Sequence, residues 1–110
     1  MNYAGQNVKN ISIKKQSDVI VKKILSVEGT VNFPVDTEVL EAGQVLISTD
    51  SGKTWEIAAS DAEANGVLCE SLKSAGVGEI MVVGVAREKY LEGYVSAHKA
   101  HLFNNKIILK

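Results

Sequence analysis

Turn-forming residues cut this sequence of 110 residues into short segments. Nine glycines and several clusters of Asn, Asp and Ser alternate with stretches that are rich in Val and Ile. Such punctuation is typical of β-strands joined by turns. The length allows one domain. Because aromatic residues make up only 5% of the chain, we expect a core built mainly from Val, Ile, Leu and Ala.

The apolar stretches predict where the strands lie. The segment 80–85 is apolar on both faces and is therefore expected to be a central strand. The clearest hairpin joins 44–49 to 54–58, and Gly52 in its turn supplies the positive φ that such a turn requires. Further strands are expected at 19–28, 66–72, 79–86 and 106–110. A turn is expected at Glu28-Gly29, a short extended piece at 31–33, and a loop at 74–78.

The last quarter of the chain changes to helical spacing. Ser96 is a candidate N-cap, and Asn104-Asn105 is a plausible end of the helix. The residues expected on its apolar face are Tyr94, Val95, His98, Leu102 and Phe103. The sequence therefore predicts a mainly β fold with one short C-terminal helix.

The charge of the chain is unevenly distributed. Residues 1–25 carry five lysines against Asp18 alone, a local charge of +4, whereas the rest carries 7 basic and 12 acidic groups, a local charge of −5. A cationic segment before an acidic body predicts an arm that meets a negative surface. We therefore expect an extended arm over residues 1–18 and a single compact β domain over residues 19–110.

The predicted arm alternates apolar and polar residues in part. Such a segment can pair its backbone with a strand edge of a partner while its lysines face an acidic surface. The alternative is that residues 8–25 form an edge strand of the body, whose lysines prevent aggregation. The candidate binding residues of the arm are Val8, Lys9, Ile11, Ile13, Lys14 and Lys15.

Few residues offer chemistry. His98 and His101 are spaced i, i+3 on the predicted helix, but zinc takes three or four ligands and no second pair accompanies them. Cys69 lies in a strand pattern and is expected to be a small core residue rather than a nucleophile. Gly76-Val77-Gly78 is too short for a phosphate-binding loop. We therefore expect no enzyme, no metal site and no cofactor.

The segment Ser48–Trp55 (STDSGKTW) resembles the Asp-box, S-x-D-x-G-x-T-W, of sialidases and other β-propellers. In those families the box is a hairpin tip whose Asp ties down the turn while the Trp packs inward. A propeller needs several repeats of about 40 residues, and a sialidase needs several arginines, of which Arg87 is the only one here. Asp50, Gly52 and Trp55 are therefore interpreted as a structural set.

The second half of the chain resembles a specific family. Ala64–Glu70 (ANGVLCE), a variable loop, Ile80–Ala86 (IMVVGVA), a helix and a terminal Lys106–Leu109 (KIIL) follow one another. This order is similar to tailed-phage head decoration proteins of the lambda D type and to related head-fibre and capsid-cement proteins. The segment Glu41–Leu46 (EAGQVL) also resembles an element of that family.

The resemblance covers residues 35–110 and implies a β-clip-like domain on the outer capsid surface of a bacteriophage virion. It also implies a late structural protein, made in the host cytoplasm, that stabilises the capsid. The implied partners are the major capsid protein, which pairs with the arm, and two further copies in a trimer at three-fold sites. The Lys-rich arm and the Asp-box-like hairpin depart from lambda D, so the mode of attachment stays open.

The scarcity of aromatic residues predicts small trimer contacts, and we expect a monomer in dilute solution. The alternative function is a small β-barrel nucleic-acid-binding module that uses the Lys-rich arm. The acidic body and the lack of interleaved aromatic residues count against it. We therefore do not expect a nucleic acid as a partner. No apolar run reaches the length of a membrane span, so a membrane is not an expected partner either.

Overall fold

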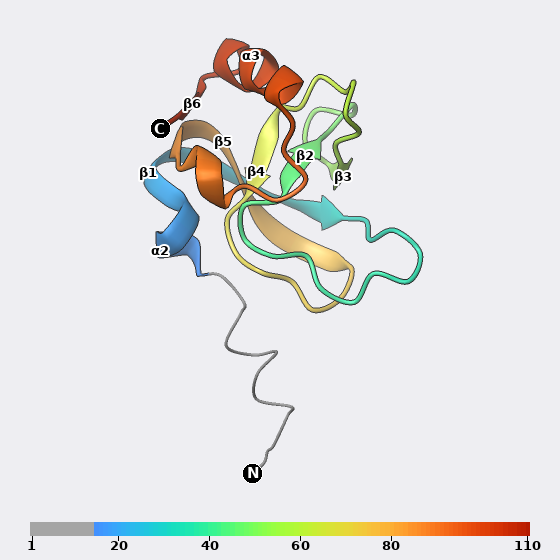
Figure 1. Ribbon diagram of the computed structural model, residues 1–110. Helices are drawn as coiled ribbons and strands as arrows, with labels where there is room; N and C mark the ends of the chain where they lie inside the picture. The colour runs from blue at the N-terminus through green and yellow to red at the C-terminus, as the bar shows by residue number, and fades with distance from the viewer. Residues whose placement is uncertain (1–14) are drawn as a thin grey trace.

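Two long strands organise the fold. The computed structural model describes residues 15–110, and in it β1 (Ile20–Val31) pairs antiparallel with β5 (Gly76–Ala86) along their whole length (Figure 1). The remaining elements are α2 (Gln16–Val19), β2 (Val45–Ile47), β3 (Thr54–Ile57), β4 (Gly66–Leu68), the 3-10 turn η1 (Glu88–Tyr90), α3 (Ser96–Asn104) and β6 (Ile107–Leu109). The protein is mainly β, with one substantial helix at its C-terminal end.

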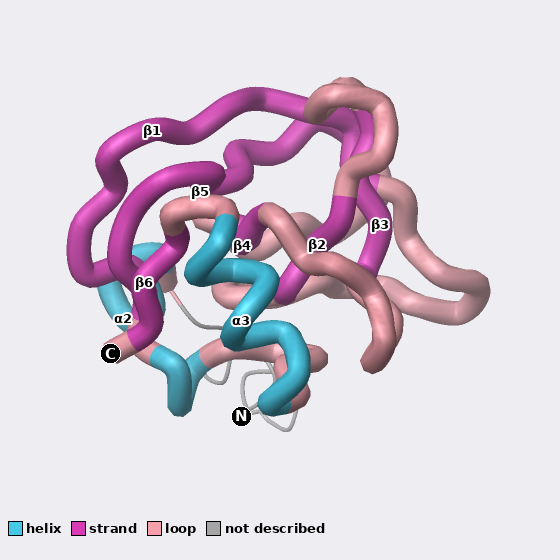
Figure 2. The backbone as a smooth tube through the Cα atoms, turned by 90° about the horizontal axis from the view of Figure 1, so that it is seen from above, coloured by secondary structure: helices cyan, strands magenta, loops and turns pink. Residues whose placement is uncertain are grey.

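The sheet closes on itself. β1 pairs with β3 in parallel at Thr30 and Val31, and β3, β2, β4 and β5 follow as antiparallel neighbours. Because β5 also pairs with β1, these five strands form a closed arrangement, and β6 extends it by pairing in parallel with the last three residues of β5. In Figure 2, β1 and β5 run together on one side, whereas β2 and β3 lie at the opposite end.

The closed sheet encloses two groups of buried side chains. One group lies under α3 and β6 and includes Val19, Val45, Val67, Cys69, Met81, Leu102 and Ile107. The other surrounds Trp55 and includes Val31, Leu40, Leu46, Leu68 and Ile80. Aliphatic residues dominate both groups, as the composition predicted.

The β2–β3 hairpin is confirmed, although its strands are shorter than predicted. The turn expected at Glu28-Gly29 is wrong, because β1 continues through both residues and pairs them with Gly78 and Glu79 of β5. For the same reason β5 begins at Gly76, within the segment that was expected to be a loop. Gly29 here serves close packing rather than a turn, since an added Cβ would lie 2.6 Å from the Trp55 ring.

The C-terminal helix is confirmed, but its expected apolar face is wrong in part. α3 ends at Asn104, as predicted, whereas its N-cap is Val95 rather than Ser96. His98 and Leu102 are fully buried, one turn apart, while Phe103 is 62% exposed. Successive residues of a helix are turned by about 100°, so Phe103 points away from the face that Leu102 buries.

The part of the predicted arm that the structure describes, residues 15–18, lies against the body. The Lys15 backbone N–H donates to the Asp18 carboxylate at 3.0 Å, at the start of α2. The guanidinium of Arg87, at the end of β5, donates to the backbone carbonyls of Ser17 and Asp18 at 3.1 and 3.2 Å. Residues 1–14, with most of the candidate binding residues, lie outside the described part of the chain.

Candidate functional site

The Asp-box-like turn uses its polar groups internally. The Thr54 backbone N–H and hydroxyl donate to the two carboxylate oxygens of Asp50 at 2.9 and 2.6 Å, and the Ser48 hydroxyl donates to Asp50 at 2.8 Å. The Gly52 N–H donates to the Ser48 hydroxyl, and Gly52 has a φ of 90°. Sequence reasoning therefore placed Asp50 and Gly52 in the correct turn, and the bonds of the Asp50 carboxylate lie within it.

Trp55 anchors this turn to the interior. Its side chain is buried, with 2% exposed, and its indole N–H donates to the Gly52 carbonyl at 3.0 Å. Two glycines from other strands lie against the indole, Gly29 of β1 and Gly66 of β4. The arrangement of Asp50, Gly52 and Trp55 is therefore that of a structural hairpin tip.

The bonds that Asp50 accepts make the hairpin sensitive to acid. Hydrogen bonds from the Thr54 hydroxyl, then from the Thr54 backbone N–H and the Ser48 hydroxyl, lower the pKa of Asp50 from its ordinary value of 3.8 to about 2. A lowered folded-state pKa stabilises the fold above the unfolded pKa, and this contribution disappears as the pH falls through the folded pKa.

We therefore expect Asp50→Ala to lower the melting temperature at neutral pH, and the difference from wild type to shrink between about pH 4 and pH 2. Asp61→Ala, on an exposed residue outside this turn, serves as the matched control and should melt like wild type. Thermal melts followed by circular dichroism at several pH values test this. An Asp50→Ala difference that is independent of pH would contradict the role of the carboxylate.

Cys69 is not a reactive thiol. It is fully buried in the core, and burial raises its pKa to about 12. A thiol needs a lowered pKa to act as a nucleophile near neutral pH. Cys69 is the small core residue that the sequence predicted.

The two histidines of α3 do not converge on a common site. His98 is fully buried, its Nδ1 accepts from the Val95 backbone N–H at 3.3 Å, and its Nε2 lies 2.7 Å from the Ala59 carbonyl. With Nδ1 as acceptor, the proton sits on Nε2 and donates to Ala59, so both ring nitrogens are used. Within residues 15–110, no group of three metal-ligating side chains forms.

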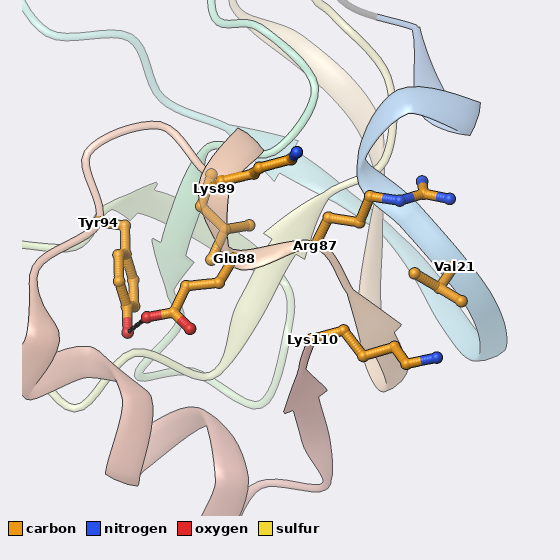
Figure 3. A pocket seen from close by; sticks show the side chains of 7 residues that line it. Val21, Arg87, Glu88, Lys89, Tyr94 and Lys110 are labelled. Carbon is orange, nitrogen blue, oxygen red and sulfur yellow. Dashed lines mark hydrogen bonds between the residues drawn. The ribbon is translucent and has the colours of Figure 1, made fainter.

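A pocket of about 750 Å³ lies beside α2 (Figure 3). The Tyr94 hydroxyl donates to Glu88 at 2.7 Å on one of its sides. This bond lowers the pKa of Glu88, while burial, followed by Glu88 itself, raises the pKa of Tyr94 to about 12. Val21, Arg87, Lys89, Leu91 and Lys110 complete the lining. The lining thus combines three cationic side chains with the aliphatic side chains of Val21 and Leu91, and such a pocket suits an anionic group.

The fold gathers the positive charge at one end of the body. The first half of β1 and all of β6 lie on either side of the last residues of β5. Residues 15–27 carry three lysines and one acid, and residues 83–110 carry five basic and two acidic groups, local charges of +2 and +3. Residues 28–82 carry two lysines and ten acids, a charge of −8. Sequence reasoning found only the N-terminal part of this positive end.

The chain matches no known protein-family model, no curated protein and no solved structure. Among residues 15–110, no helix has the length and apolar character needed to cross a membrane. The function of this protein is therefore inferred from its geometry and its charge distribution.

Proposed function

We propose that this protein is a capsid decoration protein, which binds the outer surface of a tailed-phage capsid and stabilises it. The observation that carries the proposal is the positive end of the body, which continues the charge of the Lys-rich N-terminal segment. The order of elements in residues 35–110, which resembles the lambda D type, supports the same function. A binding role without catalysis agrees with the buried Cys69 and the internally bonded Asp50 and His98.

Attachment would use two kinds of contact. Residues Val8, Ile11 and Ile13 would pair with a strand edge of the major capsid protein through their backbone, which is the general mode of strand addition. The lysines of the N-terminal segment and of the positive end would face the acidic shell. Exposed charges interact over a Debye length of about 8 Å at physiological ionic strength, so this part of the affinity is sensitive to salt.

Removal of residues 1–14 is expected to abolish most capsid binding and to preserve the fold. The described body begins at Lys15 and includes α2, which Arg87 holds in place. A chain that starts at Lys15 should keep its far-ultraviolet circular dichroism and its cooperative melt. Binding to purified, undecorated expanded capsids, measured by co-sedimentation and imaging at low and high salt, tests the loss.

A matched control removes charge elsewhere. Lys53→Gln and Lys73→Gln neutralise the two lysines of the acidic segment 28–82 and should leave capsid binding unchanged. Full binding by the shortened chain would contradict the role of residues 1–14. Tight binding of the full chain to duplex DNA, with none to capsids, would favour the nucleic-acid-binding alternative instead.

A further inference from the structure

The loop after β1 presents an apolar tip between acidic residues. Val35 is 90% exposed and Val39 is 39% exposed. Asp36 and Glu38 lie between them, are exposed, and have no ion-pair partner within residues 15–110. We call residues 34–39 the Val35 loop.

The Val35 loop is held at both ends, and on its N-terminal side the Asn32 N–H donates to the Trp55 carbonyl at 2.9 Å. The Thr37 N–H donates to the Pro34 carbonyl at 3.2 Å, which closes a turn at the tip. Leu40 is buried and exchanges two backbone hydrogen bonds with Leu72, at 3.0 and 2.8 Å. An exposed valine on an anchored turn loses little conformational freedom when it binds a partner.

An apolar groove whose neighbouring charges are basic rather than acidic lies between α3 and β6. Its volume is about 570 Å³, and we call it the α3–β6 groove. Phe103 and Ile108, which are 62% and 40% exposed, belong to its apolar lining. The remaining lining residues are Ser96, Lys99, Ala100, Ile107 and Leu109. Lys99, which also pairs with Glu88, belongs to this lining, and Lys106, directly before Ile107, is exposed. The groove is therefore apolar inside and has lysines at its rim.

The loop and the groove are complementary but lie apart on one molecule. In Figure 1 the Val35 loop projects to the right, whereas α3 and β6 lie at the upper left. We propose that the Val35 loop of one copy inserts into the α3–β6 groove of a second copy, with Asp36 and Glu38 facing the lysines of the rim. The N-terminal segment is a poorer occupant, because its lysines would meet the like charges of that rim.

Such a contact joins two different surfaces, so it is head to tail and closes into a ring when the rotation between copies permits. The contact itself needs no capsid, whereas closure with three copies rests on the proposed function. Stable interfaces bury about 1,200–2,000 Å² in total, and a single loop in one groove buries less. We therefore expect association only at high concentration, which a capsid lattice supplies locally at roughly millimolar values.

The test uses the full-length protein in solution without capsids. Sedimentation up to about 1 mM protein should show association that weakens as salt is added. Val35→Asp and Phe103→Asp should each weaken the association by about tenfold or more, because each places a charge in a desolvated apolar contact. Val77→Asp changes a valine outside both surfaces whose exposure (65%) is close to that of Phe103, and this variant should associate like wild type. Circular dichroism melts check that all three variants fold.

A mixing experiment identifies the head-to-tail geometry. The Val35→Asp variant keeps an intact groove, and the Phe103→Asp variant keeps an intact loop. An equimolar mixture of the two should therefore regain association but stop at 1:1 dimers. Failure of the mixture to associate, wild-type association by Val35→Asp, or a wild type that stays monomeric at low salt would each overturn the proposal. Since no capsid is present, failure of the capsid assay leaves these results unchanged.

Discussion

Replacing Trp55 with alanine is expected to lower the free energy of unfolding by about 3–5 kcal/mol, since the change removes the largest buried side chain and leaves a cavity. Trp55 lies in the core group that includes Leu46, Leu68 and Ile80. Its indole N–H also bonds to the turn at Gly52, so the hairpin loses its anchor. Because Trp55 is the only tryptophan, unfolding in urea should be followed by far-ultraviolet circular dichroism rather than by fluorescence.

Phe103→Ala is the matched control for this prediction. It also removes an aromatic side chain, but one that is 62% exposed. Surface substitutions usually change stability by about 0.5 kcal/mol or less. Similar losses for both variants would show that aromatic burial at Trp55 does not anchor the fold, and would contradict the core described above.

The features that the sequence predicted are local. The β2–β3 hairpin depends on Asp50 and Gly52, which bond to residues two to four positions away. The end of α3 at Asn104 likewise depends on neighbours along the chain. Short-range patterns therefore sufficed for the turn and for the helix.

The features that it missed depend on tertiary contacts. Glu28-Gly29 has the composition of a turn, but β5 offers a continuous strand partner and the pairing overrides the local preference. Phe103 fits a helical face by spacing, although the face that α3 buries carries His98 and Leu102. The positive end was visible only in part, because the sequence does not tell that residues 83–110 lie beside the start of β1.

The glycines beside Trp55 show the same dependence on long-range packing. A Cβ built on Gly66 would lie 2.5 and 2.9 Å from Cζ3 and Cη2 of Trp55 and 2.6 Å from Cγ2 of Ile80. Real side chains do not approach so closely, and both neighbours are buried, so they have little room to move. The sequence correctly predicted a strand that begins at Gly66, where β4 starts, but it does not show that the Trp55 indole lies against this glycine.

Gly66→Ala is therefore expected to cost about 3 kcal/mol, at the upper end of the usual range for overpacking a core. The cause can be isolated in a Trp55→Phe background, because a phenyl ring does not reach the positions of Cζ3 and Cη2 that crowd Gly66. There the same substitution should cost less by about 1 kcal/mol or more, the size of coupling that residues in contact show. Urea unfolding of wild type, both single variants and the double variant measures this coupling energy. Additive costs would mean that Ile80 alone limits the space at Gly66, and that the indole is free to move aside.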